Sequence, residues 1–171
     1  MSTLFVDTIN EKTSGNGVQI PGHVLQVVQA RTTSLFTHTA GSGTYSSNIT
    51  NLEAILTPKS ASSKILIICD VFAATANNNY TALWDARLMR GTTVIEDKFL
   101  RHHESASADN ASAGGSVSST FLDSPSTTSA TTYGVQITQR ITGNSLATYV
   151  NGTQNGSAVA GSSIIAMEIA Q

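Results

Sequence analysis

The chain has 171 residues and a mass of 17.9 kDa, enough for one domain with its own hydrophobic core and a short extension. Charged residues make up only 12% of it, about half the usual share, and Ser and Thr together supply roughly a quarter. The net charge is -2 and the nine Lys and Arg residues are scattered, which argues against a nucleic acid partner.

The beginning of the chain, MSTLFVD, lacks the basic start and long apolar stretch of a signal peptide. The longest apolar run, residues 65–69, is far too short to cross a bilayer. We therefore expect no signal peptide and no membrane insertion.

Residues 1–22 are predicted to form an extended N-terminal arm. Short apolar pieces alternate there with the turns SGNG and PG, which break any helix that begins. The apolar side chains are too few to enclose a core, so we expect them to pack on another chain. They are Leu4, Phe5, Val6, Ile9, Val18 and Ile20.

Residues 23–171 are predicted to form one β-domain with almost no helix. Segments rich in β-branched and aromatic residues alternate with clusters of Gly, Pro, Asn and Ser. Many short strands with polar turns indicate an antiparallel β-sandwich, and about 140 residues suit a jelly roll of eight strands. The expected strands are residues 23–30, 51–57, 64–74, 81–90, 92–101, 114–123, 131–141, 146–152 and 162–171.

For two of these strands the sequence predicts more detail. In residues 81–90 the set containing Trp84, Ala86 and Leu88 makes the better core face, and the link RGTT predicts a hairpin to the next strand. Residues 51–57 could form one helical turn, but Pro58 and the Thr-rich surroundings favour a strand.

The last strand has two apolar faces. Ile165, Met167 and Ile169 alternate with Ile164, Ala166 and Glu168, so one face is expected to be buried and the other partly buried. Such a strand is expected beside a subunit interface. Together with the unpaired arm it predicts a homotrimer with Ile165, Met167 and Ile169 in the interface, because closed cyclic symmetry limits assembly.

The single cysteine, Cys69, lies within KILIICDVF, which has the pattern of a buried strand. No disulfide can form within one chain, and no basic neighbour is evident that would lower the thiol pKa. We interpret Cys69 as a small core residue.

Three segments together resemble a family of small tail-fibre and virion-surface proteins of bacteriophages, common among phages of cyanobacteria. They are VDTINEKTSGNGVQIPGHVLQVV, TPKSASSKILI and the closing SSIIAMEIA. The resemblance covers nearly the whole chain and implies an arm that faces the virion, a trimeric jelly-roll domain like those of tumour-necrosis-factor-like proteins, and assembly with other virion proteins. Unlike longer tail fibres, this chain has no extended shaft, which leaves a host-binding fibre and a compact capsid decoration or head-fibre protein both open.

The candidates for chemistry are weak. Arg101, His102, His103 and Glu104 form the densest polar cluster, in which His with Glu could hold a metal or relay a proton. Adjacent residues on a strand point to opposite faces, however, so His102 and His103 cannot easily share one site. Asp85, Glu96 and Asp97 could supply a carboxylate pair for glycoside hydrolysis, although isolated surface charges explain them better. No nucleophile elbow, phosphate-binding loop or zinc motif is present. We expect no catalytic residues, metal or cofactor, and a protein that is not an enzyme.

The segment Asn77, Asn78, Asn79 and Tyr80 offers amides and a phenol, which suit hydrogen bonds to sugar hydroxyls and stacking on sugar rings. A turn whose asparagines adopt left-handed backbone explains the same residues. With His102 and His103 this segment is the candidate contact with a host surface glycan.

The sequence therefore predicts a homotrimeric phage tail fibre or spike, made in the host cytoplasm and located in the virion, with a capsid decoration protein as the alternative. A free carbohydrate-binding module would need no apolar arm, and a depolymerase would need a cleft with paired acids.

Overall fold

The computed structural model describes residues 6–10, 18, 20–75, 81–105, 114–140, 145–153 and 156–171, and only the backbone of residues 81, 82 and 98–105. The described part of the chain is all β. The ten strands are β1 (Val24–Thr32), β2 (Phe36–Gly41), β3 (Glu53–Leu56), β4 (Lys64–Thr75), β5 (Thr81–Arg90), β6 (Thr93–Ser105), β7 (Gly114–Asp123), β8 (Thr131–Gln139), β9 (Ser145–Val150) and β10 (Ser162–Ile169).

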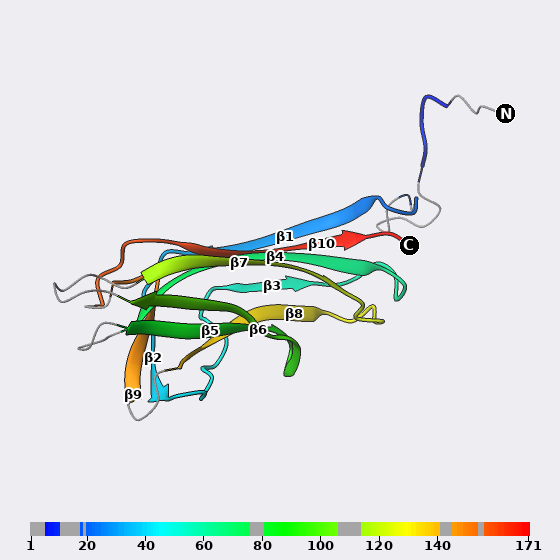
Figure 1. The fold of residues 1–171 in the computed structure, drawn as a ribbon. Coiled ribbons are helices and arrows are strands. Elements are labelled where there is room, and N and C mark those ends of the chain that lie inside the picture. The colour runs from blue at the N-terminus through cyan, green and yellow to red at the C-terminus, as the bar shows by residue number, and fades with distance from the viewer. Residues whose placement is uncertain are drawn as a thin grey trace.

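The strands form two antiparallel sheets packed face to face (Figure 1). One sheet has the order β1-β10-β4, with β7 on the other edge of β4, and the second has the order β3-β8-β5-β6. From β3 to β9 every connection except the β5–β6 hairpin crosses from one sheet to the other. This crossing pattern is that of a jelly roll, and it confirms the predicted antiparallel β-sandwich.

The core lies between the sheets and follows the two-residue period of the strands. Along β4 the side chains of Ile65, Ile67, Cys69 and Val71 are fully buried, and the residues between them are only half-buried. Trp84, Ala86 and Leu88 of β5 face these residues with no exposed surface, so the predicted core face of residues 81–90 is confirmed. The predicted hairpin is also confirmed, with Gly91 at φ 56° in its turn.

All nine expected strands are present, including residues 53–56, where the structure confirms a strand rather than a helical turn. The sequence missed β2, whose residues FTHTAG contain a single large apolar side chain, Phe36. β2 pairs with β9, which in turn pairs with the far end of β4 through Ala73 and Val150. Figure 1 shows this pair at the end of the sandwich opposite the C-terminus.

The segment between β2 and β3 pairs with the edge of β8 and places the Tyr45 ring against Arg87 on the outer face of the β3-β8-β5-β6 sheet. Backbone N–H groups of Gly43, Ser46 and Ile49 donate to the carbonyls of Gln139, Ile137 and Val135 at 3.0, 2.9 and 2.9 Å, so the segment continues the β3 edge along β8. On the same sheet Asp85 and Met89 are buried although they point away from the core. Nothing in the local sequence pattern indicates this pairing with β8.

The end of the arm is fixed to the last strand. The Gly22 N–H donates to the carbonyl of Ala170 at 2.9 Å, and the Ala170 N–H donates to the carbonyl of His23 at 2.9 Å. Residues 6–10 stand clear of the sandwich in Figure 1, and the side chains of Val6 and Ile9 are 51% and 58% exposed. Within the described ranges, no helix is long and apolar enough to cross a membrane.

Candidate functional site

The outer face of the β1-β10-β4-β7 sheet carries an unusual number of apolar side chains. Strand register aligns Val27, Met167, Leu66 and Leu122 in one row across all four strands. In the neighbouring row Ile165 and Ile68 lie between the polar residues Gln29 and Thr120. Together with the paired Val24 and Ile169 they form a surface that we call the outer apolar patch: Val24, Val27, Leu66, Ile68, Leu122, Ile165, Met167 and Ile169.

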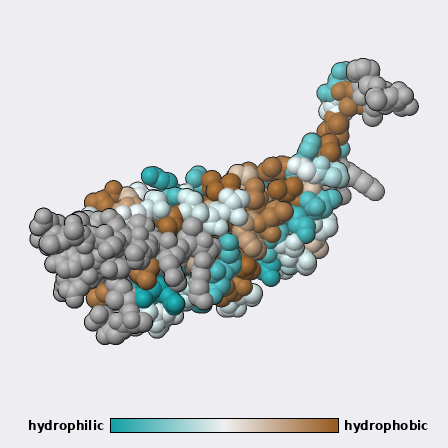
Figure 2. Space-filling model, in the orientation of Figure 1, coloured by the Kyte–Doolittle hydropathy of each residue, from teal (hydrophilic) through white to brown (hydrophobic). Residues whose placement is uncertain are grey.

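The patch is open to solvent in the single chain. Val24, Val27 and Leu122 are 52%, 56% and 54% exposed, and its other members are half-buried. Figure 2 shows hydrophobic surface gathered over the region of β1 and β10. An exposed apolar surface that spans four strands, rather than a scatter of single residues, is typical of an interaction site.

Polar residues bound the patch along the strands. Arg31, Ser163, Asp70 and Ser118 occupy the row beyond Ile165 and Ile68. The Ser118 hydroxyl donates to Asp70 Oδ2 at 2.5 Å. An apolar centre with a polar rim is the general anatomy of a protein interface.

The predicted interface residues Ile165, Met167 and Ile169 all lie in this patch. Their strand alternates between buried and half-buried residues, as the sequence indicated. Sequence reasoning missed the residues that β1, β4 and β7 contribute. The alternation of Leu66 and Ile68 with Ile65 and Ile67 was the available signal, because an apolar outer set beside a buried inner set gives β4 two apolar faces. The interface itself stays a prediction.

The predicted arm residues are only partly described. Val6, Ile9 and Ile20 are exposed and Val18 is half-buried, whereas Leu4 and Phe5 lie outside the described residues. The three exposed side chains contribute little to the core of the sandwich, and the role of the arm in attachment stays a prediction.

The predicted host-contact residues remain untested. Asn77, Asn78, Asn79 and Tyr80 lie outside the described residues. The backbone of His102 and His103 lies in β6 near its end, paired with Trp84 and Leu83 of β5, and their side chains are not described.

The carboxylates considered for hydrolysis have separate partners. Asp85 is buried with the Arg140 Nε at 3.2 Å from its Oδ2, Glu96 accepts from the Ser119 hydroxyl at 2.9 Å, and Asp97 accepts from the Tyr45 hydroxyl at 3.4 Å. No group of three potential metal ligands occurs among the described residues. Burial raises the pKa of the Cys69 thiol to about 12, which makes it a poor nucleophile, as expected of a core residue.

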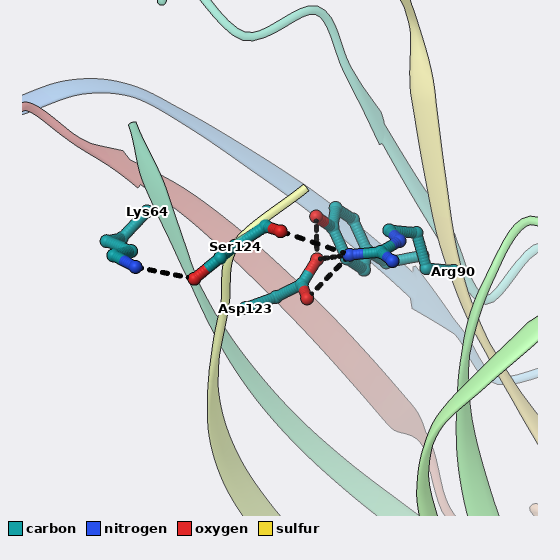
Figure 3. Close-up of polar contacts among 5 residues, drawn as sticks. Lys64, Arg90, Asp123 and Ser124 are labelled. Carbon is teal, nitrogen blue, oxygen red and sulfur yellow. Dashed lines mark hydrogen bonds and ion pairs between the residues drawn. The ribbon is translucent and has the colours of Figure 1, made fainter. Parts of the chain in front are cut away.

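One polar cluster joins the two sheets at the end of β7 (Figure 3). Arg90 Nη1 of β5 donates to both carboxylate oxygens of Asp123 at 2.8 and 2.9 Å, and the Tyr133 hydroxyl of β8 donates to Asp123 Oδ2 at 2.7 Å. Nearby, Lys64 Nζ donates to the Ser124 hydroxyl at 2.6 Å. Burial, and then the bond to Asp123, raises the pKa of Tyr133, so the phenol stays protonated. The cluster satisfies its own groups and is best explained as structural.

Comparison with known proteins returns only distant structures. No protein family and no curated protein matches the sequence. Among solved structures, those of the Gx and Gt strains of infectious bursal disease virus are 14% and 10% identical, each with a TM-score of 0.39, and a mutant VP2 protein of the same virus is 12% identical with a TM-score of 0.38. The matches cover 96% to 98% of this chain and only 41% to 42% of those chains, so this chain spans less than half of their length. At this distance no assignment rests on them.

Proposed function

We propose that the protein is a non-enzymatic structural protein of a phage virion, a homotrimeric tail fibre or spike whose arm attaches it to the particle. The observation that carries the proposal is the outer apolar patch, which a solitary chain would leave in contact with water. The phage assignment itself rests on the sequence resemblance.

A second copy of the same chain is the best occupant of the patch. Charged residues are only 12% of the chain and the net charge is -2, so copies repel one another weakly. The patch crosses four strands, and its exposed valines and leucine would gain roughly 25 cal/mol for each Å² that a neighbour removes from water. In a closed ring of three copies every patch is covered by a neighbouring chain, and no open-ended polymer forms.

The arm supports attachment to the particle. Its described apolar side chains Val6 and Ile9 are more than half exposed, so they remain available for another virion protein. A chain lacking residues 1–22 is expected to fold and assemble but to be missing from purified particles, as judged by gel analysis. Incorporation at the normal copy number would contradict this role.

Light scattering tests the trimer. The intact protein is expected at about three times the chain mass of 17.9 kDa. Val27→Asp should give monomers, because it places a charge in the apolar surface that the trimer would bury. Val159→Asp is the matched control, since Val159 is the same residue type, is 58% exposed against 56% for Val27, and lies outside the patch.

Two results would overturn the assembly proposal. One is a monomeric intact protein at micromolar concentration, and the other is a Val27→Asp protein that assembles as well as Val159→Asp.

A capsid decoration protein remains the alternative, favoured by the position of β1 directly after the arm with no shaft between them. A particle map that places the protein on the capsid lattice rather than the tail would select it.

A further inference from the structure

A shallow depression lies on the outer face of the β3-β8-β5 sheet, on the opposite side of the sandwich from the outer apolar patch. Its volume is about 620 Å³, and it opens widely to solvent. The residues that matter here are Asn48, Glu53, Arg87, Met89, Gly91 and Gln136.

Four of these side chains form a directed chain of hydrogen bonds. Arg87 donates through Nε and Nη2 to Gln136 Oε1 at 2.8 and 2.6 Å, and Gln136 Nε2 donates to Asn48 Oδ1 at 3.1 Å. Asn48 Nδ2 in turn donates to Glu53 Oε1 at 2.7 Å. Each amide is therefore oriented by its two neighbours, with a pure donor at one end and a pure acceptor at the other.

The wall of the depression is fixed by the backbone. The Ile49 N–H bonds to β8, the side chain of Ile49 is fully buried, and Asn51 turns the chain at φ 62°. Gly134 of β8 lies directly under Asn48, and a Cβ at this glycine would lie 2.6 Å from Asn48 Nδ2. Only a residue without a side chain lets Asn48 sit at this place, so the site is preorganised before any ligand arrives.

The guanidinium of Arg87 is held from a second direction. Its Cζ lies 4.0 Å from the centroid of the Tyr45 ring, which is a cation–π contact. Tyr45 thus helps to aim Arg87 along the floor of the depression, beside the nearly buried side chain of Met89.

The geometry points to a neutral sugar as the ligand of this depression, and we propose that the site binds a neutral glycan. Adjacent sugar hydroxyls both donate and accept, which matches a row that offers amides between a guanidinium and a carboxylate. One positive and one negative side chain give no net attraction for an anion, and Glu53 would repel a phosphate or a uronic acid.

The role of this site at a host surface rests on the proposed function, but the binding does not. A wide, shallow site is expected to bind one sugar unit weakly, and three copies on one particle protein would multiply the effect. Binding is therefore measured on the isolated protein, and the oligomeric state is measured in the same sample. Loss of sugar binding from an intact trimer then affects only this proposal, whereas a monomer that binds sugar affects only the assembly proposal.

Saturation-transfer NMR provides the test, with lactose, maltose, mannobiose and chitobiose as neutral probes and with glucuronic acid and inorganic phosphate as charged ones. At least one neutral disaccharide is expected to bind, and Glu53→Ala and Asn48→Ala should each weaken it at least tenfold. Gly134→Ala should weaken it as well, since the new methyl group displaces Asn48 without reaching the ligand. Thr132→Ala, on the same strand and the same outer face but outside the depression, is the matched control and should bind normally.

Three outcomes would overturn the proposal. They are no transfer to any neutral disaccharide, binding of only the charged probes, and neutral binding that survives both Glu53→Ala and Asn48→Ala. Amide spectra of each variant check that it is folded. If Gly134→Ala fails to fold, the two side-chain variants still decide the result, because both positions are at the surface.

Discussion

The two outer faces of this sandwich differ in what covers their outward-pointing side chains. The face of the β3-β8-β5-β6 sheet is partly covered by its own chain, since the segment between β2 and β3 runs along β8 with Tyr45 against Arg87, and the outward-pointing Asp85 and Met89 are buried. The face of the β1-β10-β4-β7 sheet has no such cover and keeps Val27 and Leu122 more than half exposed. The contrast underlies both proposals: we propose that the covered polar face binds a small ligand and that the open apolar face packs against another copy of the chain.

The largest expected effect is on stability, and it concerns the polar cluster that joins the two sheets and so supports both faces. Asp123→Ala would leave the Arg90 guanidinium and the Tyr133 hydroxyl without their shared acceptor between the sheets. The Arg90 side chain is 30% exposed, but Asp123 and the Tyr133 hydroxyl are buried, so the change is expected to cost about 3 kcal/mol of unfolding free energy, measured by urea denaturation.

Ser124→Ala is the control for this cluster. It removes the partner of Lys64 at an exposed position and should cost within about 0.5 kcal/mol. Equal losses in the two variants would show that the cluster does not join the sheets.

The second effect is a pH dependence of stability caused by Cys69, which lies in the core beneath the open face. The pKa of Cys69 is raised from 9.0 to about 12, chiefly by burial. A raised pKa in the folded state means that the thiol contributes its full stability below pH 9 and loses it as the pH rises toward 12. Between pH 8 and pH 10.5 the intact protein should therefore lose about 2 kcal/mol more than Cys69→Ala.

Denaturation curves of the two proteins at both pH values measure this difference. Because all tyrosines are common to both proteins, their titration cancels in the comparison. Parallel losses would mean that the thiol is open to solvent, and that the sheet under the open face is not tightly packed.

Much of the fold was predictable because side chains along a strand alternate between the buried face and the outer face, and the sequence alternates with them. KILIICDVF and SSIIAMEIA have that pattern, and both are central strands. β2 was missed because Phe36 is its one large apolar residue and its stability comes from pairing with β9, which local sequence does not reveal.

The sites were harder to predict than the strands. Ile165, Met167 and Ile169 were found from their own alternation, but the patch exists only because register brings Val27, Leu66 and Leu122 beside them. The polar depression was missed entirely. Its Asn48 and Gln136 are 88 positions apart in the chain, and nothing in either local pattern indicates the hydrogen bond between them.

A smaller effect tests whether copies cover the open face. If three chains associate through the outer apolar patch, the apparent stability should rise with concentration by roughly 0.9 kcal/mol per chain for each tenfold increase. Thermal unfolding at several concentrations measures it. Val27→Asp should remove the dependence and Val159→Asp should retain it. A dependence that persists in Val27→Asp would place the contact elsewhere.

The smallest effect tests the self-covered face. Burial, and then the charge of Asp97, raises the pKa of Tyr45 to about 12. In a titration followed by tyrosinate absorbance, the difference between the intact protein and Tyr45→Phe isolates this one residue among the four tyrosines. Asp97→Asn should lower the pKa of Tyr45 only part of the way to 10.0, because burial is the larger cause. Asp70→Asn, a carboxylate on the open face, is the control and should leave it unchanged. Tyr45 titrating near 10.0 in the intact protein would mean that the segment between β2 and β3 does not stay closed, and the contrast between the faces would then fail on the covered side.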